Sequence, residues 1–499
     1  MVLLLMNTTD YLLQLANEST VAIITPKEEF TYGDIKRKVA YLVDKFLSLG
    51  AKPGDRIGIL APNSLFWVSS YLATLKIGAI AVPFATNLTS EEFQRNEDCV
   101  NCSILCIEER LFRKYSTSIT SDINVVIDQP GSDVDFDARD LHGSQEFDVN
   151  QDAAFMFTSG TTAYPRVVRI THRNIQANTE SIINYLYLND TERIMVILPF
   201  YYCFGTSLLH THLRVGGTLV LPGPMPMVYP EQTLEMMEER ECTGLAGVPS
   251  EYQRFLRNTT FPTRSLPNLR KIQQAGGKLA DILIKELVDC RPNSQIFIMY
   301  GQTEATARLS SLQPSLVNAK MGSIGRGIPG VELKVIDEDG HCVSPGQVGE
   351  IIAKGDNISP GYLNEPEATK EKFYEGILKT GDLATVDEDG YIYIVDRKSD
   401  FIKSYGNRVS SQQIEACVLE IKDVVSAAAI GVPDIHRGEA IRVFVTLRSE
   451  SPLTPHEIIE HTKIRLAPYM IPSEVSIINT MPTNAHGKVI KSELKKYLL

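Results

Sequence analysis

Short apolar segments alternate with helical patterns through the first part of the chain, and this alternation constrains the possible folds more than any other feature. Residues 56–61, 79–83, 103–107 and 125–128 have the composition of buried strands, and residues 65–77 have the periodicity of a helix. A strand–helix–strand order favours parallel sheets that helices cover on both faces. We therefore predict an α/β fold with mostly parallel sheets.

The length and the composition indicate a large globular protein rather than a fibrous or disordered one. The chain has 499 residues, of which 43% are hydrophobic and 22% charged, and this length suggests about three folding units. Its net charge of -12 argues against general nucleic-acid binding, which needs a basic surface. A bound nucleotide would therefore need a local pocket and a divalent cation.

Neither a membrane nor an oxidising compartment is indicated. The apolar start, Met1 to Met6, is only a few residues long and has no basic flank or cleavage signal. The eight cysteines are scattered, and the one close pair, Cys99 and Cys102, has no second pair to complete a metal site. We expect reduced thiols in a cytoplasmic protein without a membrane span.

The composition changes twice in the second half of the chain. Glycines are frequent from Gly322 onwards, and β-rich segments at 331–336 and 348–353 predict a small antiparallel or barrel-like subdomain. A charged break then precedes about a hundred residues of mixed helices and strands, the size of a small domain. We predict an N-terminal domain of residues 1–396 with the β-rich subdomain over about 322–396, a mobile α+β C-terminal domain of residues 397–499, and a hinge near residues 398–399.

A polar loop lies between two apolar strand patterns, residues 153–157 and 167–170. It holds a serine, three threonines, a glycine and an arginine, whose amides, hydroxyls and charge can converge on an anion. A polyphosphate needs such a site, although an ordinary hairpin turn accounts for the loop equally well. The spacing of a Walker-type phosphate loop is absent. The loop residues concerned are Thr158, Ser159, Gly160, Thr161, Thr162 and Arg166.

Three other strand ends carry residues suited to a ligand. The aromatic run 199–205 fits either a core or a pocket wall at the carboxyl end of a strand. Gly276 and Gly277 permit close approach of a flat ligand. Thr303 and Glu304 offer a hydroxyl and a carboxylate, as a magnesium–nucleotide site would, or they form a solvated turn.

Five stretches of this chain resemble, in their order and rough spacing, the motifs of the adenylate-forming superfamily. That superfamily includes acyl-CoA synthetases, adenylation domains of nonribosomal peptide synthesis and beetle luciferases. The chain departs from the family pattern at Ala163, Arg166 and Val167, where the family usually has Gly, Lys and Gly, and at Ser399 in the hinge. The five stretches are residues 158–166, 300–304, 380–382, 396–408 and 484–488.

The resemblance implies an ATP site and a role for its residues. Glu304 and Thr161 are expected on the magnesium side and Asp382 on the ribose, with Arg397 as a catalytic companion near the hinge. Lys488 would bridge the acid carboxylate and the α-phosphate as pyrophosphate leaves. The residues expected to bind ATP are Thr158, Ser159, Gly160, Thr161, Thr162, Arg166, Gly276, Gly277, Lys278, Tyr300, Gly301, Gln302, Thr303, Asp382 and Arg397.

The same resemblance implies an acid pocket and a thiolation face. Amino-acid-activating relatives place an aspartate where Phe204 and Gly205 stand here, which favours a plain acid or a secondary amine such as proline. Tyr300 would stack on the adenine, and Lys403 and Gly406 match the segment that admits the pantetheine thiol. The residues expected in the acid pocket are Tyr202, Phe204, Val248, Ala275, Gly276 and Gly301.

The implied reaction activates a small carboxylic or amino acid with ATP as acyl-AMP. The acyl group then passes to the phosphopantetheine thiol of a separate carrier protein, as in a prolyl-type stand-alone adenylation enzyme. ATP and Mg²⁺ are the implied cofactors, with a phosphopantetheine-bearing acceptor as co-substrate. A soluble acyl-CoA synthetase that uses coenzyme A and a catalytically weakened nucleotide-binding homologue are the alternatives.

Overall fold

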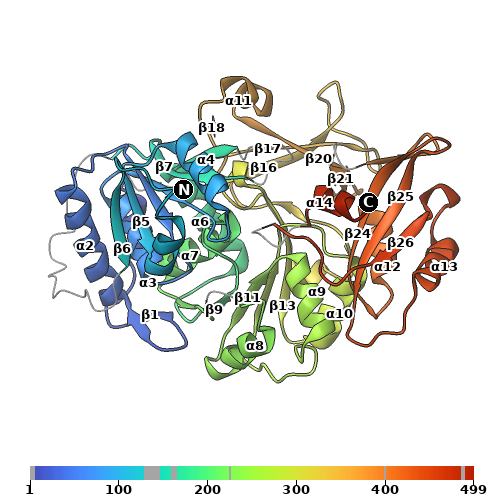
Figure 1. The fold of residues 1–499 in the computed structure, drawn as a ribbon, viewed down its shortest axis with the longest axis horizontal. Helices are drawn as coiled ribbons and strands as arrows, with labels where there is room; N and C mark the ends of the chain where they lie inside the picture. The colour runs from blue at the N-terminus through green and yellow to red at the C-terminus, as the bar shows by residue number, and fades with distance from the viewer. Residues whose placement is uncertain are drawn as a thin grey trace.

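The fold is that of a computed structural model, shown as a ribbon in Figure 1. It describes the chain except for residues 1–5, 129–146, 159–165, 224–225, 398–400, 485–488 and 499, and except for the side chain of Arg397. The described chain forms four β-sheets, with helices packed on the two larger ones. The predicted α/β fold with mostly parallel sheets is confirmed.

A seven-stranded sheet is built from the first third of the chain and one later strand. Its order is β18-β8-β7-β4-β3-β5-β6, with five parallel strands and an antiparallel edge at β8 and β18. The polar loop predicted from the sequence connects β7 with β8, so it stands at the end of an antiparallel pair. The strands are β3 (Arg56–Leu60), β4 (Ile80–Pro83), β5 (Ile104–Glu108), β6 (Asn124–Asp128), β7 (Asp152–Phe157), β8 (Val167–Thr171) and β18 (Gly361–Tyr362).

A nine-stranded sheet follows, in the order β15-β14-β13-β12-β11-β9-β10-β1-β2. Its six central strands, from β13 to β1, are parallel, and antiparallel strands close both edges. The carboxyl ends of parallel strands meet at one edge, which is where open α/β sheets bind ligands. The strands are β1 (Val21–Ile24), β2 (Glu29–Thr31), β9 (Arg193–Val196), β10 (Thr218–Val220), β11 (Gly244–Gly247), β12 (Lys271–Gln274), β13 (Gln295–Tyr300), β14 (Ser310–Leu312) and β15 (Arg326–Gly327).

Helices begin where polar side chains can cap them. Thr31, Thr89, Thr171 and Thr454 each accept a hydrogen bond from the backbone N–H three residues on, within a capping box. The helices of the N-terminal part are α1 (Thr8–Leu13), α2 (Tyr32–Ser48), α3 (Leu65–Lys76), α4 (Ser90–Val100), α5 (Glu109–Tyr115), α6 (His172–Leu186), α7 (Cys203–Val215), α8 (Pro230–Glu239), α9 (Pro249–Asn258), α10 (Asp281–Cys290) and α11 (Pro366–Lys372), with short 3-10 helices at Thr303–Ala305 and Pro314–Leu316.

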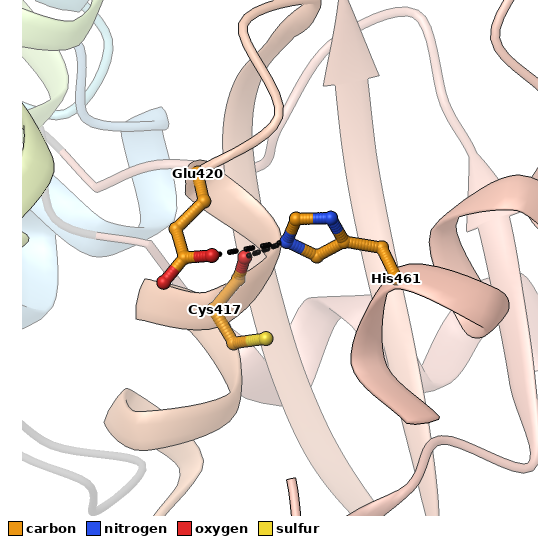
Figure 2. Close-up of side chains that lie close together, drawn as sticks. All are labelled: Cys417, Glu420 and His461. Atoms are coloured by element: carbon orange, nitrogen blue, oxygen red, sulfur yellow. Dashed lines mark hydrogen bonds and ion pairs between the residues drawn. The ribbon is translucent and has the colours of Figure 1, made fainter. Parts of the chain in front are cut away.

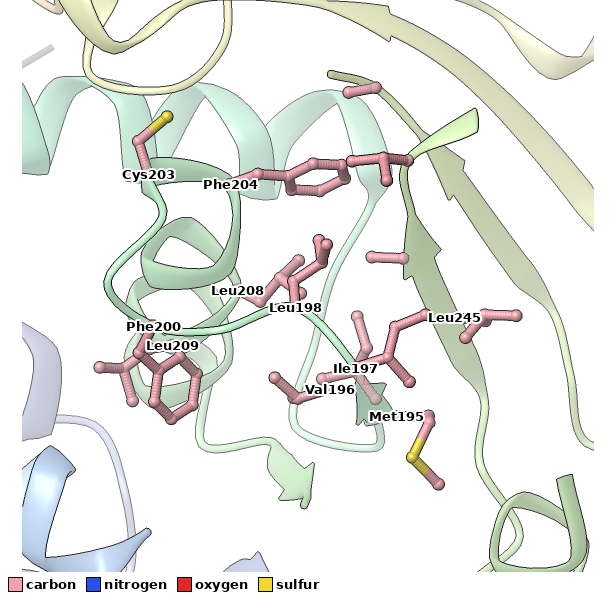
Figure 3. Packing of buried hydrophobic residues seen from close by; sticks show 14 of the residues in the cluster. Met195, Val196, Ile197, Leu198, Phe200, Cys203, Phe204, Leu208, Leu209 and Leu245 are labelled. Atoms are coloured by element: carbon pink, nitrogen blue, oxygen red, sulfur yellow. The ribbon is translucent and has the colours of Figure 1, made fainter. Parts of the chain in front are cut away.

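Buried side chains of α3 and α7 belong to the same hydrophobic core as the strands of the two larger sheets. Helix α3 buries ten consecutive residues, and its Trp67 stacks on Tyr71 with ring centroids 5.2 Å apart. Figure 3 shows side chains of β9, of α7 and of the segment between them in one cluster of buried hydrophobic residues that also holds Leu245 of β11. Helix α7 begins at Cys203, within the aromatic run 199–205, so Phe204 belongs to its first turn. The missing side chain of Gly205 allows this start, since a Cβ there would lie 2.1 Å from the carbonyl oxygen of Pro199.

The β-rich segment forms an antiparallel sheet in the order β16-β17-β20-β19, with β21 paired to β20. The turn at residues 387–390 joins β20 to β21 as a hairpin. The strands are β16 (Val331–Ile336), β17 (Gly349–Gly355), β19 (Phe373–Tyr374), β20 (Ile377–Val386) and β21 (Ile392–Arg397).

The last hundred residues form a separate sheet that lies beside α9 and α10 (Figure 1). Its order is β23-β22-β25-β24, and β26 adds to β25 in parallel. In the described part of the chain, no helix is both long and apolar enough to cross a membrane. The elements are β22 (Ile402–Ser404), β23 (Asn407–Val409), α12 (Ser411–Leu419), β24 (Val424–Asp434), β25 (Gly438–Leu447), α13 (Pro455–Arg465), a 3-10 helix (Pro468–Met470), β26 (Glu474–Ile477), α14 (Lys491–Leu494) and a 3-10 helix (Lys495–Leu498).

Candidate active site

A cleft of about 690 Å³ lies between the strand ends of the nine-stranded sheet and the C-terminal elements. The N-terminal part contributes residues of three separate stretches, represented by Gly276, Tyr300 and Asp382. The C-terminal part contributes helix α12 and the segment around Val489. The cleft thus brings together three of the sequence stretches that were predicted to bind ATP, and its predicted lining residues are Val248, Gly276, Gly277, Lys278, Tyr300, Gly301 and Asp382.

Tyr300 and Asp382 form a fixed polar pair in this cleft. The Tyr300 hydroxyl donates a hydrogen bond to Oδ2 of Asp382 at 2.6 Å, and both residues are buried. Gln302 lies beyond them, with Nε2 at 3.4 Å from the same hydroxyl. Asp382 stands directly opposite Arg397 in the pairing of β20 with β21. A carboxylate oriented in this way can accept hydrogen bonds from a ligand's hydroxyl groups.

Two glycines, Gly276 and Gly301, line the cleft at positions where a side chain would not fit. Gly276 has a φ of +86°, and a Cβ on it would lie 2.8 Å from Cγ1 of Val248. A Cβ on Gly301 would lie 1.9 Å from the carbonyl oxygen of Ala307. The close approach of a flat ligand that was predicted for Gly276 is therefore compatible with the backbone here.

Glu304 offers a carboxylate on the 3-10 helix Thr303–Ala305, which lies against β8. The Tyr362 hydroxyl donates to its Oε1 at 2.8 Å, and burial together with this carboxylate raises the pKa of Tyr362. One hydrogen bond leaves most of the lone pairs of Glu304 available. Hard carboxylate oxygens are the ligands that Mg²⁺ prefers, so Glu304 fits the predicted metal role. Thr161, its predicted partner, lies outside the described residues.

The described ends of the polar loop are Thr158 and Arg166. The Thr158 N–H donates to the carbonyl oxygen of Arg166 at 2.9 Å, so these two ends are held together. Arg166 pairs with Glu365 at 3.1 Å and lies over the Tyr362 ring at 5.2 Å. Val167 is buried as the first residue of β8, which accounts for a β-branched residue in place of the family's glycine. The loop residues that lie outside the described part are Ser159, Gly160, Thr161, Thr162 and Ala163.

The residues predicted to form the acid pocket divide into two groups. Val248, Gly276 and Gly301 line the cleft. Phe204 and Ala275, at 2% and 3% exposure, do not line it. Tyr202 joins the two groups, because its hydroxyl lies 3.0 Å from where a Cβ on Gly276 would stand and its ring centroid lies 6.4 Å from that of Phe204.

The C-terminal elements place two predicted residues away from the cleft and leave a third undescribed. Lys403 is exposed on β22, and Gly406 has a φ of +78° in the turn to β23. Lys488 lies outside the described residues. Its neighbour Lys491 lines the cleft, where its Nζ pairs with Glu415 at 2.8 Å.

Cys417, Glu420 and His461 meet at the edge of the C-terminal part, as Figure 2 shows. His461 Nε2 lies 3.1 Å from the carbonyl oxygen of Cys417 and 3.2 Å from Oε2 of Glu420. Glu420 also pairs with Arg465 at 2.7 Å, and burial raises the pKa of the Cys417 thiol to about 11. A protonated thiol and an engaged carboxylate are poor metal ligands, so this group tethers α12 to α13. All eight cysteines are free thiols, including the close pair noted in the sequence.

Sequence reasoning missed several side chains that hold the site together. Tyr362 gave no signal, because a single tyrosine after Gly361 fits no motif. Asp396 is fully buried, and its Oδ2 accepts hydrogen bonds from the Ser410 hydroxyl at 2.9 Å and from the Ser411 N–H at 3.1 Å. A buried carboxylate therefore joins β21 to the start of α12, on either side of the predicted hinge.

Models of known protein families match nearly the whole chain. The model of the AMP-binding enzyme family matches residues 15–363, and that of the AMP-binding enzyme C-terminal domain matches residues 413–488. A feruloyl-CoA synthase from Amycolatopsis sp is 29% identical over 469 residues, which are 93% of each chain.

Two solved structures have the same fold. The o-succinylbenzoate CoA synthetase from Bacillus subtilis, in complex with its acyl-adenylate intermediate, is 26% identical with a TM-score of 0.83 and covers 98% of each chain. An anthranilate CoA ligase in complex with anthranoyl-AMP has a TM-score of 0.89 over 99% of this chain and 98% of its own. At 24% identity, the second likeness is one of fold.

Proposed function

The chain belongs to the family of AMP-binding enzymes within the adenylate-forming superfamily, and from this premise we propose that it joins a small carboxylic acid to coenzyme A. As an AMP-forming acid–thiol ligase, it activates its acid with ATP as an acyl-adenylate and releases pyrophosphate. The observation that carries the proposal is the cleft itself, which gathers the stretches at 276–278, 300–301 and 382 around one space.

The chemistry asks for positioning and charge neutralisation rather than for a protein nucleophile, because the acid carboxylate attacks the α-phosphorus. Asp382, held by Tyr300, would accept hydrogen bonds from the ribose hydroxyls. The backbone at Gly276 and Gly277 would lie against the adenine. Glu304 would hold Mg²⁺, which neutralises phosphate charge when bound. Lys488 would neutralise the carboxylate and the α-phosphate, as the family resemblance implies.

We assign the second half-reaction to the C-terminal part. Its predicted hinge near residues 398–399 would let the same domain first close Lys488 over the adenylate and then present Lys403 and Gly406 to the thiol. This proposal includes the domain boundary at 396–397, the face of the C-terminal domain that carries Lys488 and the face that carries Lys403 and Gly406.

Coenzyme A is the acceptor we propose, and the relatives support this choice. Feruloyl-CoA synthase, o-succinylbenzoate CoA synthetase and anthranilate CoA ligase are all named for CoA thioesters. All three acids are aromatic, which suits a pocket beside the Tyr202 ring. Loading of a carrier protein by a prolyl-type enzyme was predicted from the sequence, and it is the alternative that the assay must separate.

The test supplies ATP, Mg²⁺ and one acid at a time, with either coenzyme A or a phosphopantetheinylated carrier protein as acceptor. Ferulate, 2-succinylbenzoate, anthranilate, benzoate and proline form the panel. We expect an acyl-CoA by mass spectrometry and one AMP per thioester, and we expect Asp382→Asn to lower the rate. Asp389→Asn, in the turn after β20 with 67% of its side chain exposed, is the matched control. If a thioester formed only on the carrier protein, coenzyme A would not be the acceptor. If ADP rather than AMP were the product, the proposed reaction itself would be wrong.

A further inference from the structure

Arg308 is a fully buried cation without a counter-ion in the described part of the chain. It lies between the 3-10 helix at 303–305 and β14, with 1% of its surface exposed. Its Nε and Nη2 have no hydrogen-bond partner, and no carboxylate of the described residues pairs with it. Burying an unpaired guanidinium is costly, since it loses water and gains no anion. The position therefore needs an explanation beyond packing.

The neighbours of Arg308 are aromatic and polar but not acidic. Its guanidinium lies over the Phe204 ring, with Cζ 3.8 Å from the centroid. Burial lowers the pKa of Arg308, and the groups that raise it are Tyr185, Cys203 and Tyr202. Burial raises the pKa of Tyr185 to about 12 and also raises that of Cys203, so neither of these two groups supplies a negative charge at neutral pH. Arginine keeps its charge under such conditions.

Arg308 stands beside the predicted acid pocket. Phe204 and Tyr202, two of the predicted walls, lie at the start of α7, whose N-terminus no side chain caps. An uncapped helix N-terminus adds partial positive charge on the same side. The carbonyl of Ala307, the residue before Arg308, packs against the cleft floor at Gly301.

The two unpartnered nitrogens are the ones that bind a carboxylate most favourably. Nε–H and Nη2–H point from the same edge of the guanidinium and match the two oxygens of a carboxylate, in a bidentate pair. The backbone of Arg308 is fixed, since Asn178 Nδ2 and Asn357 Nδ2 donate to its carbonyl oxygen at 3.0 and 2.9 Å. The free edge thus belongs to a side chain whose backbone is anchored on both sides.

We propose that Arg308 binds a second, non-reacting carboxylate of the acid substrate, so that the enzyme selects dicarboxylic acids. This inference rests on the proposed function and narrows its substrate class. One carboxylate reacts at the α-phosphate, and the other enters the layer behind Phe204 and pairs with the guanidinium. Phe204 or Tyr202 must rotate to admit it, because neither the cleft nor the open surface reaches Arg308.

Arg291 provides a matched control within the same chain. Its guanidinium also stacks on an aromatic ring, with Cζ 4.4 Å from the Phe261 centroid. Its Nη1 and Nη2, however, donate to the carbonyl oxygens of Arg264 and Phe261, so that only its Nε is left without a partner among the described residues. Arg291 is therefore an arginine that stacks on a ring for structural reasons. Arg308 differs from it because both Nε and Nη2, on one edge of its guanidinium, lack a partner.

The test compares length-matched acids in acid-dependent ATP–pyrophosphate exchange: succinate with butyrate, and the three phthalate isomers with benzoate. We expect kcat/KM to favour the dicarboxylic member of at least one pair. Arg308→Met should lower that preference about 10- to 100-fold, as expected for the loss of a charge-assisted hydrogen-bonded pair. Arg308→Lys should keep part of it, and Arg291→Met should leave it unchanged.

A second measurement does not depend on turnover. The preferred dicarboxylic acid should raise the melting temperature of the wild type and of Arg291→Met but not that of Arg308→Met. Exchange with monocarboxylic acids and no preference for any diacid would overturn the inference and leave the proposed function standing. Equal preference in the wild type and in Arg308→Met would overturn it as well. Absence of exchange with every acid would overturn the proposed function itself, and this inference with it.

Discussion

The hydroxyl of Tyr300 determines how Asp382 faces the cleft. Tyr300→Phe removes the 2.6 Å hydrogen bond while keeping the ring, so Asp382 loses a donor that orients its carboxylate. We expect the KM for ATP to rise about 2- to 10-fold, as for the loss of one hydrogen bond. Steady-state kinetics measure this change. Tyr32→Phe is the control, because its hydroxyl donates to the Gly217 carbonyl oxygen at 2.8 Å, away from the cleft. An equal rise in both variants would contradict the assignment.

The carboxylate of Glu304 carries the proposed metal role. Glu304→Gln keeps an acceptor for the Tyr362 hydroxyl but removes the negative charge that Mg²⁺ requires. We expect exchange to fall about 100-fold or more, a loss typical of transition-state charge stabilisation. Titration with Mg²⁺ should show a weakened dependence in the variant. If Mg²⁺ dependence and rate match the wild type, Glu304 does not hold the metal.

Single residues also show what the sequence alone was able to indicate. Gly276, Tyr300 and Asp382 were predicted from motifs and do line one cleft, because strand ends of a parallel sheet meet at one edge. Arg308 and Tyr362 were missed, because their importance depends on burial and on partners distant in sequence. The deviation at Val167 needed the structure as well, since only its position at the start of β8 explains it.

Helices α9 and α12 are joined by one arginine across the two parts of the chain. Arg257 Nη1 donates to the carbonyl oxygen of Lys422 at 3.0 Å, and Nη2 pairs with Glu286 of α10 at 2.7 Å. Its side chain is almost fully buried, so this contact is shielded from solvent. The arginine therefore stabilises the observed placement of α12 beside α9 and α10.

Arg257→Met should loosen this placement. It leaves a carbonyl and Glu286 without their donor, which should cost about 1–3 kcal/mol. Hydrogen exchange followed by mass spectrometry should show faster exchange in peptides of α12 and β24. Arg264→Met, which breaks the pairs with Glu231 and Glu238 at 3.3 and 3.1 Å within the N-terminal part, should leave those peptides unchanged. Equal exchange in the wild type and Arg257→Met would refute the role.

At the level of elements, the sequence predicted strands and helices within a few residues, because apolar periodicity and turn residues act locally. The order of the strands in the sheets could not be predicted from the sequence. β18, from residues 361–362, pairs with β8 almost two hundred residues earlier, and no local pattern encodes that pairing. The start of α7 at Cys203 depended on the contact between Gly205 and Pro199, which is a tertiary feature.

The whole molecule carries three buried histidines that should make it sensitive to acid. Burial lowers the pKa of His172 and His210 to about 3 and that of His212 to about 4. The pKa in the unfolded chain is about 6.5, so the unfolded state binds more protons below that pH. The stability that these neutral rings contribute is complete above pH 6.5 and is lost as the pH falls towards 4 and 3.

Urea unfolding between pH 7 and 5 measures this loss, which is at most about 1.4 kcal/mol per histidine and pH unit. His172→Asn, which keeps an acceptor for Thr8, should flatten the dependence. His456→Gln, at an exposed position, should not change it. An unfolding free energy that is equal at the two pH values would contradict the account.

The central claim is that the cleft activates a carboxylic acid as its adenylate, and acid-dependent exchange of labelled pyrophosphate into ATP tests it most directly. The account predicts exchange that requires Mg²⁺ and one acid of the panel, needs no thiol, and nearly disappears in Lys488→Ala while ATP still binds. Full exchange in Lys488→Ala, or no exchange with any acid, would contradict it.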